Sequence, residues 1–154
     1  GTHRPERKLL VIEQIKNSIK KHEGFRNKVY KDTLGKRTIG YGHLCVEDWW
    51  EDDKEYPDAQ LDRVFDGDFE IAKNSASELY KDCGIKDEAK GIIIEMVFQL
   101  GPTGVKKFKK MWVALNENPP NYREASVQML DSRWAKQTKN RAEGLAKTMR
   151  NIGV

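Results

Sequence analysis

The stretch "HEGFRNKVYKDTLGKRTIGYGH", residues 22–43, decides how the chain begins to fold. Ahead of it, isoleucines recur at spacings of three and four, which predicts an amphipathic helix over residues 9–23. Gly24 ends this helix, because glycine readily takes the left-handed conformation that follows a helix end. The stretch therefore opens with a helix stop and leads into a different kind of structure.

A β-hairpin is predicted next. Val29 and Tyr30 precede the turn sequence "DTLG", and the β-branched Thr38 and Ile39 follow it, so Gly35 is expected in or near the turn. Gly40 and Gly42 would then fall on one face of a strand with period two. A strand face without side chains would let a sugar chain approach the backbone closely.

Two carboxylates in this stretch are candidates for acid–base chemistry. Glu23 is expected in the last turn of the helix, where the negative end of the helix dipole and any burial favour the protonated form that a general acid needs. A break at Gly24 and a hairpin can bring Asp32 back across from Glu23. Paired carboxylates of this kind are typical of glycoside hydrolysis. The alternative is that both are solvated surface groups or helix caps.

The remainder of the chain predicts helices. A long one begins near Asp58, and a nearly apolar one, "KDEAKGIIIEMVFQLG", is expected at the centre of the core. "TGVKKFKKMWVALNE" is predicted as one further helix, and "YREASVQMLD", "SRWAKQT" and "NRAEGLAKTMR" as three shorter ones. Residues 45–58 indicate a loop or short helix. With one early β patch among helices, the expected fold class is α+β.

Composition sets limits on the class of protein. The 154 residues include 38% hydrophobic and 34% charged residues with a net charge of +4, which suits a small domain with a mild preference for anionic partners. Cys45 and Cys83 form no metal or disulfide pattern and are expected to be reduced and mostly buried. We see no membrane span or export signal in this sequence, so the expected location is a cytoplasm.

The ordered string of residues 22–43 closely resembles the active-site segment of the T-even bacteriophage lysozymes, the phage-type endolysins of glycoside hydrolase family 24. Two more blocks match in the same order, "MVFQLGPTGVKKF" at 96–108 and "SRWAKQTKNRA" at 132–142. The resemblance covers the chain from about residue 12. It implies a small β-containing lobe and a larger helical lobe joined by one long helix.

The resemblance also implies roles for individual residues. Glu23 matches the general acid, Asp32 the carboxylate that acts on the hydrolytic water, and Thr38 the residue that helps to hold that water. The resemblance implies four substrate-binding residues. Leu44, Phe98 and Gln99 would lie in the cleft, and Arg141 would lie near the general acid. Met111 and Gln128 depart from the family pattern, which has a serine that contacts substrate at the first position and an asparagine at the second.

On this basis, residues 1–154 are expected to form a single lysozyme domain. It comprises a tail and first helix (1–23), a β-containing lobe (24–57), a connecting helix (58–82) and a helical lobe (83–154). Residues 1–8 could be a frayed terminus or foreign to the protein, so no fold prediction is made for them and the first helix is expected to begin at residue 9. The implied activity is inverting hydrolysis of the β-1,4 bond between N-acetylmuramic acid and N-acetylglucosamine of peptidoglycan, by a monomer. No cofactor, metal, nucleic acid or membrane insertion is expected.

The same resemblance implies an endolysin that lyses its host. It would leave the host cytoplasm through a holin-type pore to reach the periplasm and cell wall. Three alternatives stay open: a lysozyme domain of a phage tail protein, a non-catalytic wall-binding module, and a lytic transglycosylase, against which Asp32 argues weakly. A zinc amidase would lack ligands.

Three side-chain environments are also predicted. His43 could join His22 and Cys45 in a zinc site, but a structural hydrogen bond to a carboxylate is the preferred interpretation, and the resemblance implies that this carboxylate is Asp68. Trp112 and Trp134 are expected to pack in the core, and Trp49 and Trp50 are left open between core and sugar contact.

Overall fold

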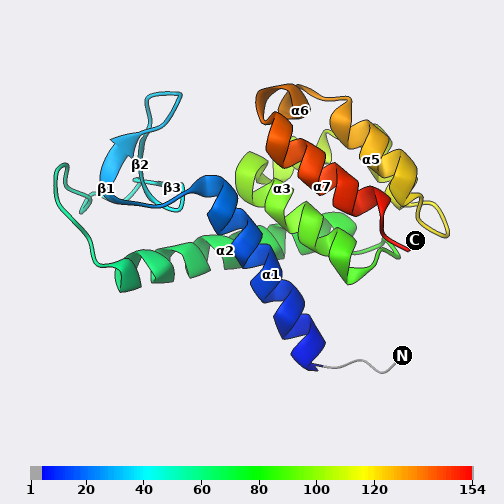
Figure 1. The fold of residues 1–154 in the computed structure, drawn as a ribbon, viewed down its shortest axis with the longest axis horizontal. Helices are drawn as coiled ribbons and strands as arrows, with labels where there is room; N and C mark the ends of the chain where they lie inside the picture. The colour runs from blue at the N-terminus through cyan, green and yellow to red at the C-terminus, as the bar shows by residue number, and fades with distance from the viewer. Residues whose placement is uncertain (1–4, 154) are drawn as a thin grey trace. The chain divides into compact units, whose positions relative to one another are not determined.

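The computed structural model describes residues 5–153, which form an α+β fold of seven helices and one three-stranded antiparallel sheet (Figure 1). This confirms the predicted fold class. In chain order the elements are α1 (Pro5–Glu23), β1 (Arg26–Lys31), β2 (Arg37–Gly40), β3 (His43–Leu44), α2 (Asp58–Tyr80), α3 (Asp87–Lys106), α4 (Lys109–Leu115), α5 (Tyr122–Leu130), α6 (Arg133–Gln137) and α7 (Lys139–Arg150).

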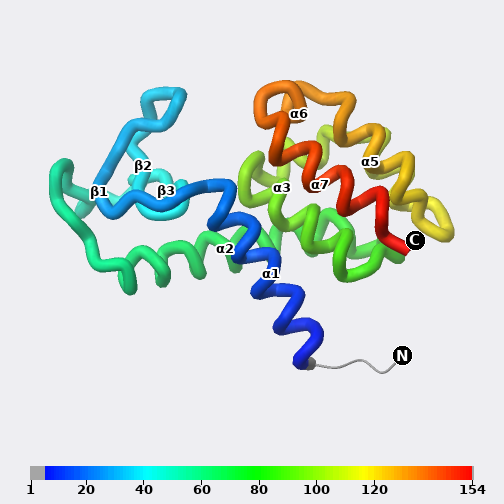
Figure 2. The backbone as a smooth tube through the Cα atoms, in the orientation of Figure 1, coloured from blue at the N-terminus to red at the C-terminus, as the bar shows by residue number. Residues whose placement is uncertain are grey.

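The chain divides into two compact units. Residues 16–71 form one, called here the β unit, and the described parts of 1–15 and 72–154 form the other, called here the helical unit. Both divisions fall inside helices, α1 and α2, and Figure 2 follows the backbone through them. The predicted lobe boundaries at 24, 58 and 83 stay a prediction.

The sheet of the β unit has the order β1–β2–β3. Tyr30 pairs with Thr38 across β1 and β2, and Thr38 pairs with Leu44 across β2 and β3. Ile39 instead pairs with His43, and its side chain is fully buried in a core that includes Trp50. Neighbouring residues of a strand point to opposite faces of the sheet. The face that carries Ile39 therefore covers the core, and Tyr30, Thr38 and Leu44 lie on the other face.

The first helix packs within the β unit through its lysines. The amine of Lys20 lies 5.1 Å from the centre of the Tyr41 ring and 5.0 Å from that of Phe65 on α2. Phe25 contacts Tyr41 with ring centres 4.9 Å apart. These contacts fix the end of α1 against the strand β2, the turn after it and α2.

The helical unit is built around α3. Its residues from Ala89 to Val97 are mostly buried, as the apolar sequence predicts. Ile15 of α1 packs so closely on Gly91 that a Cβ there would lie 2.7 Å from its Cδ1. The helix α7 contacts α3, α5 and α6. The buried apolar faces of these helices supply the main folding free energy of this unit.

Three predictions about local structure are wrong. The first helix begins at Pro5 and not at residue 9, because proline suits the first position of a helix and Arg7 pairs with Glu88 at 3.4 Å. Residues 1–4 of the predicted tail lie outside the described residues. The single helix predicted over 103–117 is divided, since its start belongs to α3 beyond a kink at Gly101 and α4 begins only at Lys109.

The third concerns Gly40 and Gly42. Both have positive φ, 64° and 76°, so they form the tight turn at the end of β2 rather than one face of a continuous strand.

In the described part of the chain, no helix has the length and apolar character needed to cross a bilayer.

Candidate active site

Glu23 is the last residue of α1. The helix stops there because Gly24 has φ 75° and its N–H donates to the carbonyl of Lys20 at 3.0 Å, as predicted. The carboxylate lies against Gly42, where an added Cβ would come within 2.6 Å of Oε1 of Glu23. The missing side chain at Gly42 therefore makes the room that the Glu23 carboxylate occupies.

Asp32 begins the turn between β1 and β2 and is held by the backbone. Its Oδ1 accepts the N–H groups of Leu34 and Lys36, both at 2.9 Å, while its carbonyl accepts the N–H of Gly35 at 2.9 Å. Two charge-assisted hydrogen bonds to one oxygen fix the direction of the carboxylate. Its other oxygen, Oδ2, makes no hydrogen bond within residues 5–153.

Thr38 is almost completely buried in β2. Its hydroxyl donates to the carbonyl of Lys36 at 2.9 Å, which leaves the oxygen lone pairs as acceptors. Lys36 also donates its N–H to Asp32, so both candidate residues are tied to the same backbone position. Leu44, beside Thr38 in the next strand, is partly exposed.

Tyr30 belongs to this group of side chains, although no role was predicted for it. Burial chiefly, followed by the negative charge of Glu23, raises the pKa of Tyr30; Asp32 adds to the rise and Arg26 opposes it. The Arg26 guanidinium lies 4.8 Å from the ring centre. The sequence carried a signal for this grouping, because Tyr30 and Asp32 are two residues apart and side chains at that spacing on an extended chain point to the same face.

His43 is structural, and its predicted pairing with Asp68 is confirmed. Its Nδ1 lies 2.8 Å from Oδ2 of Asp68, and its Nε2 lies 2.9 Å from Oε1 of Glu47. The hydrogen bond with Asp68, helped by Glu47 and opposed by burial, raises the pKa of His43 to about 9. No group of residues able to hold a metal ion occurs within 5–153, so the zinc alternative finds no support there.

Glu47 was not anticipated as a second partner. Besides His43 it accepts a hydrogen bond from Nε1 of Trp50 at 2.6 Å. Burial acts to raise the pKa of Glu47, but the hydrogen bonds from His43 and Trp50 outweigh it and the pKa is lowered. Of the two tryptophans left open, Trp50 is a core residue at 4% exposure, whereas Trp49 is 59% exposed.

The remaining candidates, Phe98, Gln99 and Arg141, belong to the helical unit. Gln99 accepts a hydrogen bond from Nε1 of the buried Trp134 at 2.8 Å. Arg141 donates from Nε to Oε2 of Glu95 at 2.9 Å, and both side chains are buried. The structure thus gives Gln99 and Arg141 anchoring contacts, and the roles of Phe98, Gln99 and Arg141 toward substrate stay predictions. The Glu95 partner was not foreseen.

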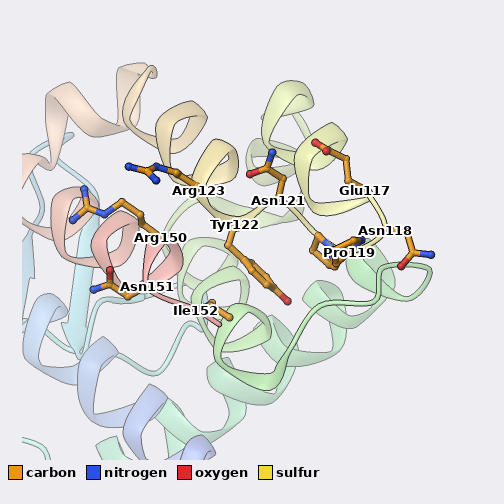
Figure 3. A pocket seen from close by; sticks show the side chains of 10 residues that line it. Glu117, Asn118, Pro119, Asn121, Tyr122, Arg123, Arg150, Asn151 and Ile152 are labelled. Carbon is orange, nitrogen blue, oxygen red and sulfur yellow. The ribbon is translucent and has the colours of Figure 1, made fainter. Parts of the chain in front are cut away.

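The helical unit, as far as the structure describes it, includes two sizeable cavities. One, of about 550 Å³, is lined by residues that include Met111 and Gln128, the two positions that depart from the family pattern. Met111 is fully buried, so it forms part of the core beneath this cavity. The other, of about 840 Å³, is shown in Figure 3, where Arg123 and Arg150 lie on one side and the Tyr122 ring lies between them and Pro119. Neither cavity includes a candidate residue.

Comparison with known proteins agrees with this fold. The family model described as "Phage lysozyme" matches residues 20–151. Two relatives from Dictyostelium discoideum are similar, "Probable T4-type lysozyme 2" at 27% identity and "Probable T4-type lysozyme 1" at 30%. Each alignment covers 86% of this chain and 91% of the relative.

The fold and these matches define a glycoside hydrolase of the lysozyme type. The chain belongs to the phage lysozyme family.

Proposed function

We propose that this enzyme hydrolyses the β-1,4 bond between N-acetylmuramic acid and N-acetylglucosamine in bacterial peptidoglycan, with inversion at the anomeric carbon. The observation that carries the proposal is that Glu23 and Asp32 flank β1 within one compact unit, Glu23 at the end of α1 with its carboxylate against Gly42, and Asp32 fixed by backbone N–H groups of the turn after β1. Acid–base cleavage of a glycosidic bond requires a pair of carboxylates, one as acid and one as base.

Glu23 acts as the general acid in this proposal. It donates its proton to the glycosidic oxygen as the bond to the anomeric carbon breaks, so the leaving sugar departs with a neutral hydroxyl group. The positive φ of Gly42 and its lack of a side chain support this role, because they leave space at the Glu23 carboxylate.

Asp32 acts as the general base. Water attacks the anomeric carbon from the opposite face while Asp32 takes one of its protons, giving a reducing-end N-acetylmuramic acid. The fixed Oδ1 supports this assignment, since it aims Oδ2 at one position. Thr38 holds the same water through its lone pairs, as its hydroxyl proton is already donated to Lys36.

Substrate contacts are proposed for Leu44, Phe98, Gln99 and Arg141. The partial exposure of Leu44 beside Thr38 supports an apolar contact with the sugar ring. The proposal extends to a phage endolysin that clears the host wall after passing from the cytoplasm through a holin-type pore, acting as a monomer. A lysozyme domain of a tail protein would carry out the same chemistry.

The test is digestion of purified peptidoglycan followed by mass spectrometry of the muropeptides. Hydrolysis yields reducing-end products, a transglycosylase yields 1,6-anhydro products, and a wall-binding module yields none. Glu23→Gln should keep the fold by circular dichroism and lower the rate at least a thousandfold, because the leaving oxygen loses its acid. Activity within tenfold of the parent enzyme would refute the assignment of Glu23.

A further inference from the structure

Tyr30 occupies a defined place on the sheet face that carries the candidate residues. It lies directly opposite Thr38 in the strand register, and Asp32 follows it by two residues. Opposite residues of an antiparallel pair share one face, with their Cβ atoms about 4.5–5.5 Å apart. Tyr30, Thr38 and Leu44 therefore form one row across the three strands.

The phenol of Tyr30 is suited to donate a hydrogen bond here. Its pKa lies above its ordinary value, so the hydroxyl keeps its proton throughout the neutral range. Arg26 holds the ring from one side by a cation–π contact at 4.8 Å. The Tyr30 hydroxyl has no hydrogen-bond partner in residues 5–153, and the side chain is only partly buried, so this donor is available to a bound molecule.

We propose that Tyr30 is a substrate-binding residue whose hydroxyl donates a hydrogen bond to a polar substituent, a hydroxyl or acetamido oxygen, of the sugar held between Glu23 and Asp32. The inference rests on the proposed function. An inverting site places the reacting sugar between its acid and its base. Tyr30 lies opposite Thr38, which is proposed to hold the attacking water, and two residues before Asp32, so its side chain borders that sugar in the proposed site. A neutral donor can bind the oxygens of the sugar without adding charge.

The test compares Tyr30→Phe with Tyr41→Phe, both measured as kcat/KM on solubilised peptidoglycan. Tyr30→Phe keeps the ring that Arg26 covers and removes only the hydroxyl. Loss of one buried hydrogen bond to substrate should lower kcat/KM roughly ten- to hundredfold. Tyr41 lies in the turn after β2, with its ring packed between Phe25 and Phe65, so its matched variant should stay within threefold.

Rates are normalised to the folded fraction measured by circular dichroism, so that a change in stability does not imitate a loss of binding. Tyr30→Phe within threefold of the parent enzyme would overturn the inference, and so would an equal loss in Tyr41→Phe. Glu23→Gln is run in parallel. If it is inactive while Tyr30→Phe is active, only this inference fails; if it is active, the proposed function fails and the inference with it.

Discussion

The network of His43 with Asp68 and Glu47 should make the stability of this enzyme depend on pH in a specific direction. His43 has a folded pKa of about 9 against an ordinary value of 6.5. Its contribution to stability is therefore fully present below pH 6.5 and is lost as pH rises through about 9. Glu47 has a lowered pKa, so its contribution is present above its ordinary value of 4.5 and is lost as pH falls through the folded one.

The magnitude follows from the two pKa values of His43. The difference between 6.5 and about 9 corresponds to about 3 kcal/mol of unfolding free energy. Asp68 and Glu47 each keep 27% of their side-chain surface exposed, so solvent screening reduces this to about 2 kcal/mol. Asp68 is the largest cause of the raised pKa, and Asp68→Asn should cost about 1–2 kcal/mol near pH 5.5 but under about 0.5 kcal/mol near pH 10.

Urea denaturation of the parent enzyme and of Asp68→Asn at both pH values measures the difference. Asp66→Asn on the same helix is the matched control, because Asp66 pairs with Lys16 at 3.4 Å near the surface and does not contact His43, and its effect should not change between the two pH values. In a His43→Gln background, Asp68→Asn should lose its pH dependence. An equal loss at pH 5.5 and pH 10 would refute the reasoning.

Two further predictions concern close packing and a buried charge. Gly42→Ala should cost about 1–2 kcal/mol from its positive φ and should lower activity more than tenfold by displacing the Glu23 carboxylate. Gly153→Ala, with φ 80° and no atom closer than 3.8 Å to the added Cβ, should be strained in the same way at full activity, and equal activity of the two variants would contradict this. Arg141→Met should lose about 3–5 kcal/mol in urea melts, because it leaves the Glu95 carboxylate buried without this guanidinium. Adding Glu95→Gln should recover part of that loss, and strictly additive losses would argue against the pair.

Much of the fold was predictable because its signals are local. The helix stop at Gly24, the turn at Gly35 and the apolar run of α3 are each written in a few consecutive residues. The pairing of His43 with Asp68 came from family resemblance and not from spacing. The division of α3 from α4 at Lys107 and Phe108 was missed because no glycine or proline marks it in the sequence.

The contacts that were missed depend on which side chains share a face. Glu47 reads in the sequence as one of many acidic loop residues, and only the position of His43 and Trp50 makes it a hydrogen-bond acceptor for both. Tyr30 likewise reads as an ordinary aromatic strand residue until its register with Thr38 is known. Glu95 lies in an apolar helix, where its partner Arg141 is distant in the sequence.

The turn that holds Asp32 has a consequence for chain topology. The donors to its carboxylate, Leu34 and Lys36, lie on either side of Gly35. A circular permutant opened at Gly35 would keep every helix and could keep its strands paired, but would separate Asp32 from one of its two donors. New termini placed in the exposed loop before Pro57 would leave residues 23–38 continuous. In this hairpin the covalent continuity of the loop, and not only its packing, aligns the proposed base.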